Sequence, residues 1–581
     1  MDPLIDLHEV SFFYPTNPER MVLHGIDLQV DEGEFVALVG ANGSGKSTLL
    51  RLIAGLLNPS KGEVRIAGRT THLTENQIML HTTLGMVFQY PEDQIVGTTV
   101  EEDIAFGLEN LGWQPEDMRK RVDEMLIALD LQEQRHRPSH LLSAGQTQRL
   151  ALAGVLAPNP RLLLFDEATT MLDPRGRKEL MERMKQLHRD GITIIMVTHH
   201  MEEAAQAQRT VVLYQGNIVA DGTPQSVFSQ ISLLKQCGLA APDHLQLAAI
   251  LQLYVPGLSR NPANLEELIK TLYRLSPGNI VPAEESKYCL PETKATVIQV
   301  ESLNHFYKDE DGQINATLRD VSLRVLQNCS HSLLGATGSG KSTLMLNMMG
   351  LEKPQGGRIQ IGDVVVTDRQ TKMRDILKQV GMVFQSPEIQ FFEQYAGDEV
   401  AYGAIMQHLD HEEVVRRVRW AMEIVGLDFE AFKDRLTFSL SGGERRKLAL
   451  ASTLVLQTPI LLLDEPTAGL DPSSRKEIIQ RLQRMRQDGR TLLLSTHDLN
   501  DVAALTENTT IMDGGKVAYS GSTRQAFWMP EMVNAAGLDI PAAAKVAQAM
   551  RNAGWQLPEG IITISELESC LAASGSMVLH G

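Results

Sequence analysis

The chain has 581 residues, a length that predicts two or more domains. Its composition, 43% hydrophobic and 22% charged, excludes a disordered or fibrous protein. Its formal net charge of −18 argues against nonspecific nucleic-acid binding, which needs clustered Lys and Arg.

Two further features of the sequence bear on where the protein works. No uncharged apolar stretch reaches the about 18 residues of a membrane-spanning helix, and MDPLIDLHEV lacks the basic segment of a secretory signal. The four cysteines are scattered and form no CxxC pair, which indicates a reducing compartment and argues against a zinc or iron–sulfur site.

The first predicted elements enclose a phosphate-binding loop. EFVALVG over 34–40 is an apolar strand, TLLRLIAGLL over 48–57 has helical spacing, and GANGSGKS between them fits the pattern GxxxxGK[ST]. Its backbone N–H groups would wrap the phosphates, Lys46 would reach the β- and γ-phosphates, and the Ser47 hydroxyl would bind Mg²⁺. The predicted contacts are Gly40, Ala41, Asn42, Gly43, Ser44, Gly45, Lys46, Ser47 and Thr48.

Next in the chain, an apolar strand ends at Gln89 beside an acidic segment. Glu92 and Asp93 follow the glutamine closely, and a second acidic cluster occupies 101–103. A solvated acidic loop is one interpretation of this segment.

LSAGQ over 142–146 opens a predicted helix, TQRLALAGVLA. A serine and small residues at a helix N-terminus form a second anion site, here Ser143, Ala144, Gly145 and Gln146. One half of the chain is therefore predicted to carry two phosphate-binding elements, the glycine-rich loop and the start of this helix.

Two later strands end in side chains suited to phosphate chemistry. RLLLF over 161–165 is followed by Asp166, a candidate Mg²⁺ ligand, and Glu167, a candidate base for the attacking water. GITIIMVT over 191–198 precedes His199, which would hydrogen-bond the γ-phosphate. A lone strand-end histidine is more often structural, and we give that role to His200 and His331.

Every motif of the first half returns in the second half in the same order, so the chain is a tandem duplication. Short apolar strands alternate with helices in each copy, which predicts α/β domains with a mostly parallel sheet. We expect a first domain over 1–255, a linker over 256–295 with one amphipathic helix, a second domain over 296–540 and a C-terminal tail over 541–581. The predicted second site comprises Gly335, Ala336, Thr337, Gly338, Ser339, Gly340, Lys341, Ser342, Thr343, Gln385, Ser441, Gly442, Gly443, Glu444, Asp464, Glu465 and His497.

The recurrence of the histidines in one frame favours their phosphate-binding role over the structural one. A single ATP cannot easily need both phosphate devices of one copy. We therefore expect the two halves to pack head-to-tail as an intramolecular pseudo-dimer, with ATP between each phosphate loop and the other copy's LSGGE-type helix.

Together and in this order, these motifs resemble the ATP-binding-cassette (ABC) ATPases over nearly the whole chain. LSAGQ and LSGGE match that family's signature sequence. The resemblance implies an ATPase fold with a helical signature subdomain, and ATP and Mg²⁺ as cofactors. It assigns Tyr14 and Tyr307 to adenine stacking, Gln89 and Gln385 to sensing Mg²⁺ and γ-phosphate, and Asp173 and Asp471 to the D-loops.

The acidic segment after Gln89 resembles the ATPases of energy-coupling-factor importers, which take up vitamins and transition metals. That resemblance implies two partners, an integral-membrane scaffold and a substrate-capture membrane subunit, at the cytoplasmic face of the cell membrane. Glu92, Asp93 and Glu388 would pair with arginines of the scaffold. The transported substrate cannot be read from this chain, because in that family a separate subunit binds it.

Both copies keep the glutamate and the histidine, which predicts two hydrolysis-competent sites, although the copies differ around these residues. Ala144 replaces the first signature glycine, Ala168 stands where a proline follows Glu465, and QNCSHSLLG over 327–335 is a more polar approach to the loop than EGEFVALVG. Two other functions remain open. One is a twin-cassette ATPase acting in translation or DNA repair, and the other is the ATPase of an exporter.

Overall fold

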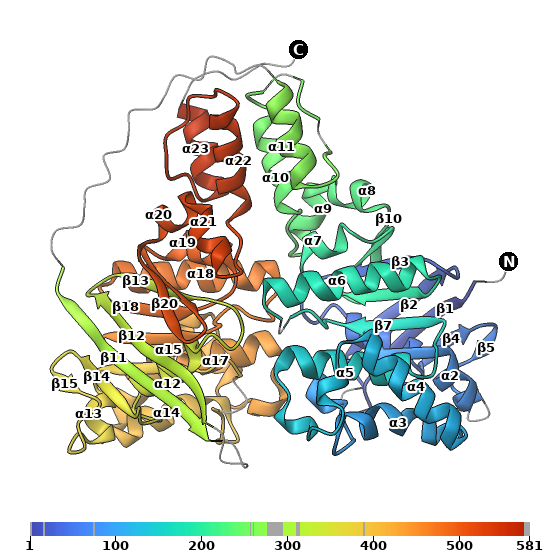
Figure 1. The fold of residues 1–581 in the computed structure, drawn as a ribbon, viewed down its shortest axis with the longest axis horizontal. Coiled ribbons are helices and arrows are strands. Elements are labelled where there is room, and N and C mark those ends of the chain that lie inside the picture. The colour runs from blue at the N-terminus through green and yellow to red at the C-terminus, as the bar shows by residue number, and fades with distance from the viewer. Residues whose placement is uncertain are drawn as a thin grey trace. The chain divides into compact units, whose positions relative to one another are not determined.

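The computed structural model describes residues 3–15, 18–73, 76–170, 172–255, 257–259, 261–275, 294–308, 314–386 and 390–573 (Figure 1). The predicted partner-binding residue Glu388 lies outside this part of the chain. The chain divides into two compact units, residues 1–242 with 471–473 and residues 243–470 with 474–581. None of the described helices is long and apolar enough to cross a membrane.

The first unit is built on a six-stranded sheet in the order β10-β9-β3-β8-β7-β6. The five strands from β9 to β6 are parallel, and β10 is an antiparallel edge. Three central strands are buried along their whole length, as expected of parallel strands covered on both faces. The strands are β3 (Phe35–Val39), β6 (Leu84–Val87), β7 (Leu162–Asp166), β8 (Thr193–Val197), β9 (Arg209–Tyr214) and β10 (Asn217–Gly222).

A second, antiparallel sheet of the first unit has the order β2-β1-β4-β5. Its buried residues share one core with α1 and with the main sheet, so the phosphate loop is held between two sheets. These strands are β1 (Ile5–Phe13), β2 (Met21–Val30), β4 (Lys61–Ile66) and β5 (Arg69–Thr70).

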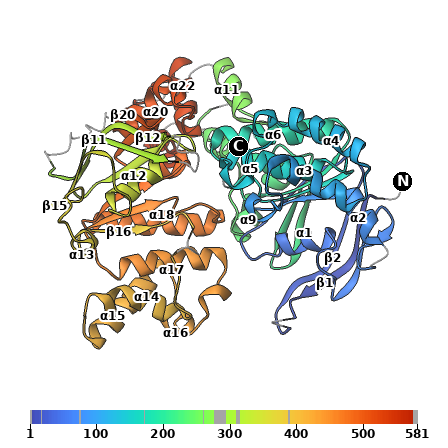
Figure 2. The ribbon, with the colours of Figure 1, turned by 60° about the horizontal axis from the view of Figure 1, so that its bottom comes forward.

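Helices α3, α4 and α5 of the first unit pack on one another as a helical group (Figure 2). A capping box between Thr99 and Glu102 starts α3, and Asp173 with Pro174 starts α6. The helices are α1 (Lys46–Ile53), α2 (Gln77–Thr83), η2 (Pro91–Asp93), α3 (Val100–Asn110), α4 (Pro115–Ala128), η3 (Gln132–Gln134), η4 (Ser139–Leu141), α5 (Ala144–Leu156), α6 (Pro174–Arg189), α7 (Met201–Ala204), α8 (Pro224–Phe228) and α9 (Ile231–Gln236).

The second unit repeats this plan with sheets in the orders β16-β17-β18-β13-β19-β20 and β12-β11-β14-β15. Strand β13 has the sequence SHSLL and is buried, with His331 bonded to Thr510 at 2.8 Å. The strands are β11 (Thr296–Lys308), β12 (Ile314–Leu326), β13 (Ser330–Leu334), β14 (Gly356–Ile361), β15 (Val364–Val365), β16 (Val380–Val383), β17 (Ile460–Asp464), β18 (Thr491–Ser495), β19 (Asn508–Asp513) and β20 (Lys516–Ser522).

Helices α14, α15 and α17 form the corresponding helical group of the second unit (Figure 2). Asp410 caps the start of α15, and Gly426, with φ 78°, ends it in the left-handed conformation that glycine adopts readily. The helices are α12 (Lys341–Met348), α13 (Met373–Leu377), α14 (Ala396–Met406), α15 (His411–Val425), α16 (Phe429–Phe432), η6 (Thr437–Ser439), α17 (Gly442–Leu454), α18 (Pro472–Gln487), α19 (Leu499–Leu505), α20 (Thr523–Trp528) and α21 (Pro530–Ala535).

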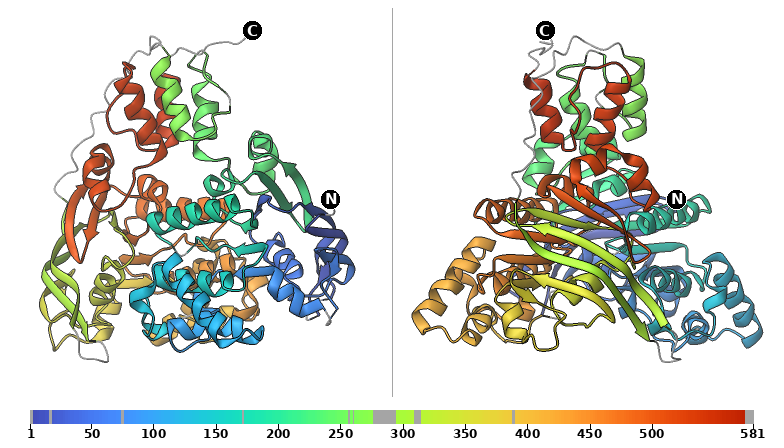
Figure 3. Two further views of the ribbon diagram at one scale, coloured as in Figure 1. Left: turned by 45° about the vertical axis from the view of Figure 1, so that its right-hand side comes forward. Right: turned by 60° about the vertical axis from the view of Figure 1, so that its left-hand side comes forward.

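Four helices from the two ends of the second unit form a separate core, seen as the adjoining green and red helices in Figure 3. They are α10 (Asp243–Leu251), α11 (Leu265–Arg274), α22 (Ala542–Asn552) and α23 (Ile564–Ala573). The amphipathic helix predicted in the linker is confirmed as α11, whose Leu268 and Leu272 are buried in this core. The boundaries at 255, 295 and 540 stay predictions.

Candidate functional site

In the first unit, the predicted phosphate loop connects β3 to α1 in a conformation that requires glycine. Gly43 and Gly45 have φ angles of 77° and 105°, in the left-handed region. A side chain at Gly40 would place its Cβ 2.3 Å from the Leu213 carbonyl oxygen. The loop backbone is therefore tightly curved, and at these glycines no side chain would separate its N–H groups from an anion.

Lys46 lies under this loop and is only 5% exposed. Its Nζ donates to the carbonyl oxygens of Gly40 at 2.9 Å and Ala41 at 3.1 Å. Burial lowers the pKa of Lys46, and the carboxylates of Glu167 and Asp166 partly offset that effect. The Ser44 hydroxyl is buried nearby without a hydrogen-bond partner among the described residues. A phosphate group would satisfy both the ammonium and this hydroxyl.

The second unit holds the same arrangement between β13 and α12. Lys341 Nζ donates to the carbonyl oxygens of Gly335 at 2.8 Å and Ala336 at 3.0 Å. Gly338 and Gly340 have φ angles of 80° and 100°. Both copies of the motif thus form the same cradle.

A serine hydroxyl and an aspartate meet beside each cradle. Ser47 Oγ donates to Asp166 Oδ1 at 2.8 Å, and Ser342 Oγ donates to Asp464 Oδ2 at 2.9 Å. Burial raises the pKa of both aspartates, and the serine hydrogen bond counteracts it. A hydroxyl and a carboxylate at this separation are oxygen ligands of the kind that Mg²⁺ prefers.

Glu167 and Glu465 follow these aspartates in strained backbone conformations. Their φ angles are 50° and 49°, uncommon for residues other than glycine, and each backbone N–H bonds to the neighbouring strand, at Val197 or Ser495. Strain of this kind concentrates at functional sites, because it fixes where a side chain points.

The predicted glutamine and histidine converge on Glu167 in the first unit. Gln89 Nε2 donates to Glu167 Oε2 at 3.2 Å, and His199 Nδ1 lies 3.6 Å from the same oxygen, an ion-pair distance. Burial alone would raise the pKa of Glu167. The neighbouring His199 and Lys46 together lower it by more than burial raises it, so the net pKa shift is downward. Glu167 is therefore held as a carboxylate, the form that a general base needs.

In the second unit, His497 makes the closer contact. Its Nδ1 lies 2.9 Å from Glu465 Oε1, a hydrogen bond. Gln385 follows β16 at the position corresponding to Gln89, and its side chain is exposed. The two sites thus share their residues but differ in the contacts that hold the glutamate.

Comparison with known proteins agrees with this geometry. The model of the ABC transporter family matches residues 23–170 and 318–468. A putative ABC transporter ATP-binding protein of Methanosarcina mazei is 32% identical, with 98% of each chain covered.

The chain belongs to the ABC transporter family.

Other similar proteins carry more specific names. A putative HMP/thiamine import ATP-binding protein of Bacillus subtilis is 30% identical, with 93% of this chain and 95% of that protein covered. The solved structure of cbiO1 from Clostridium perfringens, part of the ABC transporter complex cbiONQ, is 32% identical. It covers 44% of this chain and 99% of its own, with a TM-score of 0.37.

The two units are accordingly ABC cassettes, and the chain is an ATP-binding ATPase of this family. Its two signature helices, α5 and α17, begin alike. Ser143 and Ser441 accept hydrogen bonds from the backbone of Gln146 and Glu444, whose side chains bond back to the serine N–H in capping boxes. The part that these helices play in binding ATP stays a prediction.

Tyr14 lines a cavity of ≈ 500 Å³ beside the first phosphate loop. Gly43, Gly45 and Thr48 line it too, so a nucleotide whose phosphates occupy the loop would reach the tyrosine with its base. The sequence analysis missed six further lining residues, Arg20, Met21, Val22, His24, Gln215 and Gly216. No motif marks them, because they come from the start of β2 and from the turn between β9 and β10, which meet only in the fold.

The sequence analysis also missed a buried polar network in each cassette, which includes the threonine two residues after Glu167 or Glu465. In the second cassette, Asp501 accepts from Thr467 at 2.5 Å and from Arg475 Nε at 2.8 Å. Burial raises the pKa of Asp501 to about 6 despite the neighbouring Arg475. The signal available in the sequence was recurrence, since the residues have counterparts in the first half at the same spacing: Thr169, Arg177 and Glu203.

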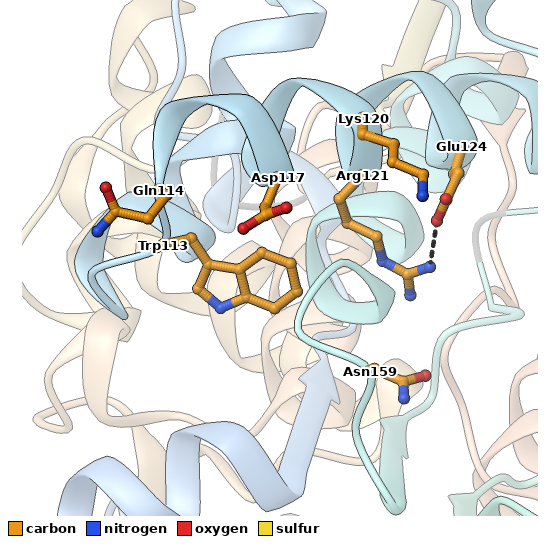
Figure 4. A pocket seen from close by; sticks show the side chains of 7 residues that line it. All are labelled: Trp113, Gln114, Asp117, Lys120, Arg121, Glu124 and Asn159. Carbon is orange, nitrogen blue, oxygen red and sulfur yellow. Dashed lines mark hydrogen bonds and ion pairs between the residues drawn. The ribbon is translucent and has the colours of Figure 1, made fainter.

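A second cavity of the first cassette, ≈ 580 Å³, lies between the start of α4 and the end of α5 (Figure 4). Trp113 and Asn159 line it, and Arg121 bonds Glu124 at 3.0 Å at its edge. The Arg121 guanidinium also donates to the carbonyls of Leu156 and Ala157. Arg121 therefore fixes the end of α5, and we assign this cavity a structural role.

Proposed function

We propose that the chain is the ATP-hydrolysing motor of an energy-coupling-factor type importer, acting on separate membrane subunits. The observation that carries this proposal is the segment after Gln89. Glu92 and Asp93, on η2, are exposed carboxylates three and four residues from a glutamine that contacts Glu167. A partner bound to the carboxylates would thereby be linked to the ATP site.

The segment is anchored at both ends, as mechanical coupling requires. Gln94 Oε1 accepts from the backbone N–H of Phe88 at 3.3 Å. At the other end Asp103 Oδ1 accepts from the N–H groups of Val96 at 2.8 Å and Gly97 at 2.9 Å. A displacement of the loop is therefore transmitted to α3 and to β6.

The corresponding segment of the second cassette is anchored in the same way. Glu399 Oε2 accepts from the N–H groups of Phe392 at 3.0 Å and Glu393 at 2.9 Å, the same anchor as in the first cassette. Phe392 is 60% exposed and packs edge-on against Tyr402 with ring centroids 4.3 Å apart. Val96, at the matching position of the first cassette, is 63% exposed, so both segments present an apolar side chain that a partner could contact.

We further propose that MgATP binds at each cradle, with Ser47, Ser342, Asp166, Asp464, Gln89 and Gln385 holding the metal. When bound, Mg²⁺ would neutralise charge on the phosphate oxygens. Glu167 and Glu465 would accept a proton from the attacking water, and His199 and His497 would hold the γ-phosphate. The LSAGQ and LSGGE helices would complete the two sites as composites.

The name of the Bacillus subtilis relative refers to HMP/thiamine import. For this chain we propose uptake of a vitamin or a transition metal through a substrate-capture subunit, with the chain at the cytoplasmic face of the membrane. The exposed acidic pair beside the ATP site favours this function over a role in translation or DNA repair.

An affinity capture of the tagged full-length protein from detergent-solubilised native membranes tests the proposal, with mass spectrometry of what accompanies it. We expect an integral-membrane scaffold and a small membrane protein that names the substrate class. Recovery of ribosomal or DNA-repair proteins without a membrane subunit would overturn the importer function and leave the ATPase intact.

A further inference from the structure

The second cassette contains a polar cluster, His305, Asn347 and Glu352, next to Tyr307. His305 and Tyr307 lie on β11, Asn347 lies on α12, and Glu352 follows that helix. The His305 side chain is 4% exposed and Asn347 is fully buried. Buried polar groups are costly unless they are hydrogen-bonded, so their partners decide what the cluster does.

A continuous chain of hydrogen bonds runs through the cluster to the tyrosine. Tyr307 Oη donates to Glu352 Oε2 at 2.5 Å, and His305 Nε2 lies 3.0 Å from the same oxygen. His305 Nδ1 lies 3.2 Å from Asn347 Nδ2, which also donates to the Thr343 carbonyl at 2.7 Å. The Glu352 carboxylate accepts from Nε2–H, while Nδ1 lies within hydrogen-bond distance of both the Asn347 amide nitrogen and its oxygen, the latter at 3.3 Å.

The first cassette has apolar residues at the three matching positions. Phe12, Leu52 and Leu57 stand where the second cassette has His305, Asn347 and Glu352, and all three belong to or pack against the apolar core. Tyr14 packs against the same core, and its hydroxyl lies 3.1 Å from Thr48 Oγ1. Apolar residues at these three positions are therefore compatible with the cassette fold. The polar residues of the second cassette then have a role other than folding.

The hydrogen bonds that restrain the two tyrosines differ in strength. A hydrogen bond to a carboxylate is about twice as strong as one between neutral groups, so Glu352 restrains Tyr307 more firmly than Thr48 restrains Tyr14. The ring of His305 also meets that of Tyr307 edge-on, with centroids 4.8 Å apart at 61°. Tyr307 is nevertheless 41% exposed, which leaves part of its ring accessible to a ligand.

We propose that Glu352, anchored by His305 and Asn347, positions the Tyr307 ring and pre-organises the adenine platform of the second nucleotide site. This inference rests on the proposed role of Tyr307 in stacking on adenine. A ring already fixed in its bound orientation loses less conformational freedom when the base binds. The cluster therefore strengthens binding of the base in the second site and leaves phosphate binding unaffected.

Photolabelling of the full-length protein with 8-azido-ATP tests this, because peptide mapping separates the site of Tyr14 from that of Tyr307. The quantity measured is the concentration of ATP, or of inorganic tripolyphosphate, that half-protects each peptide. The variants are E352L and H305F, which install the residues of the first cassette, E352Q, which keeps an oxygen acceptor, and Y307A. The first site of each molecule is the internal control.

In E352L and H305F we expect about fivefold more ATP for half-protection of the second site, equivalent to about 1 kcal/mol for one lost oriented contact. Protection by tripolyphosphate should not change at either site, and E352Q, which keeps a neutral hydrogen bond, should recover about half of the loss. Thermal unfolding checks that each variant is folded.

Three results would overturn the inference. If E352L and H305F behave like the unmodified protein while Y307A weakens ATP binding, the cluster does not position the tyrosine. If E352L weakens ATP and tripolyphosphate equally, its role is structural. If Y307A itself has no effect, the assignment of Tyr307 to adenine fails and the inference fails with it.

Discussion

The hydrolysis chemistry proposed for each cassette depends on single side chains. Glu167 and Glu465 sit on backbone with positive φ, at the carboxyl ends of buried strands, and each has a histidine within ion-pair distance. The contacts differ, since Gln89 reaches Glu167 while His497 bonds directly to Glu465. The two sites are thus equipped with the same groups but not poised identically.

The first prediction concerns these two glutamates. We expect E167Q and E465Q each to remove at least about half of the steady-state ATPase activity, and the double variant to lose about 10²-fold or more, because a general base is absent. Phosphate release by the assembled complex is the measurement. E133Q changes an exposed glutamate and is the matched control. Near-full activity in both single variants would contradict the assignment.

A second residue-scale prediction concerns pH. Burial lowers the pKa of His331 to about 4, so the folded chain keeps it neutral while the unfolded chain takes up a proton below its ordinary pKa of 6.5. Protonation of His331 therefore has little effect on the free energy of unfolding above pH 6.5. As the pH falls from 6.5 toward 4, it lowers that free energy increasingly.

In urea unfolding of the protein and of H331V, with valine as at Val36 of the first cassette, we expect the difference in unfolding free energy to shift between pH 7.5 and pH 5. The shift should be about 2 kcal/mol in favour of the variant at the lower pH. A pH-independent difference would show that His331 is not held neutral.

Among the elements, the phosphate loops and the strands beside them could be predicted from the sequence because their residues are contiguous. GANGSGKST and FDE each carry their full chemistry within a few positions. The His305 cluster could not be predicted this way, because about 40 residues separate His305 from Asn347 and each residue is ordinary alone. Only the comparison of the two copies in the fold shows that the second has three polar residues where the first has three apolar ones.

The four-helix core of α10, α11, α22 and α23 escaped prediction for the same reason. The sequence indicates α11 through its amphipathic pattern, but nothing in it pairs that helix with one near the C-terminus. Apolar burial between distant segments becomes visible only when the fold brings them together.

A third prediction tests this core. Leu272 is fully buried, and L272A should destabilise the four-helix core by about 2–5 kcal/mol, through lost burial and the cavity left behind. Hydrogen exchange of the α22 and α23 amides is the measurement, and faster exchange is expected. Y273A changes a neighbour that is 52% exposed and should have little effect. Equal protection in L272A would show that the linker helix does not support the C-terminal helices.

At the scale of the whole molecule, the two cassettes share their sequence motifs but differ in the residues around Tyr14 and Tyr307. The first supports Tyr14 with apolar residues, and the second holds Tyr307 through Glu352, His305 and Asn347.

Charge reversal of the acidic pair tests the central claim most directly. E92R/D93R and the control E116R/D117R, an acidic pair at the start of α4, would be compared for the membrane subunits that co-purify with each tagged full-length protein. We predict that E92R/D93R loses the membrane scaffold while the control retains it, because only the first pair faces the basic coupling segment. Equal recovery of the scaffold with both variants would contradict the account.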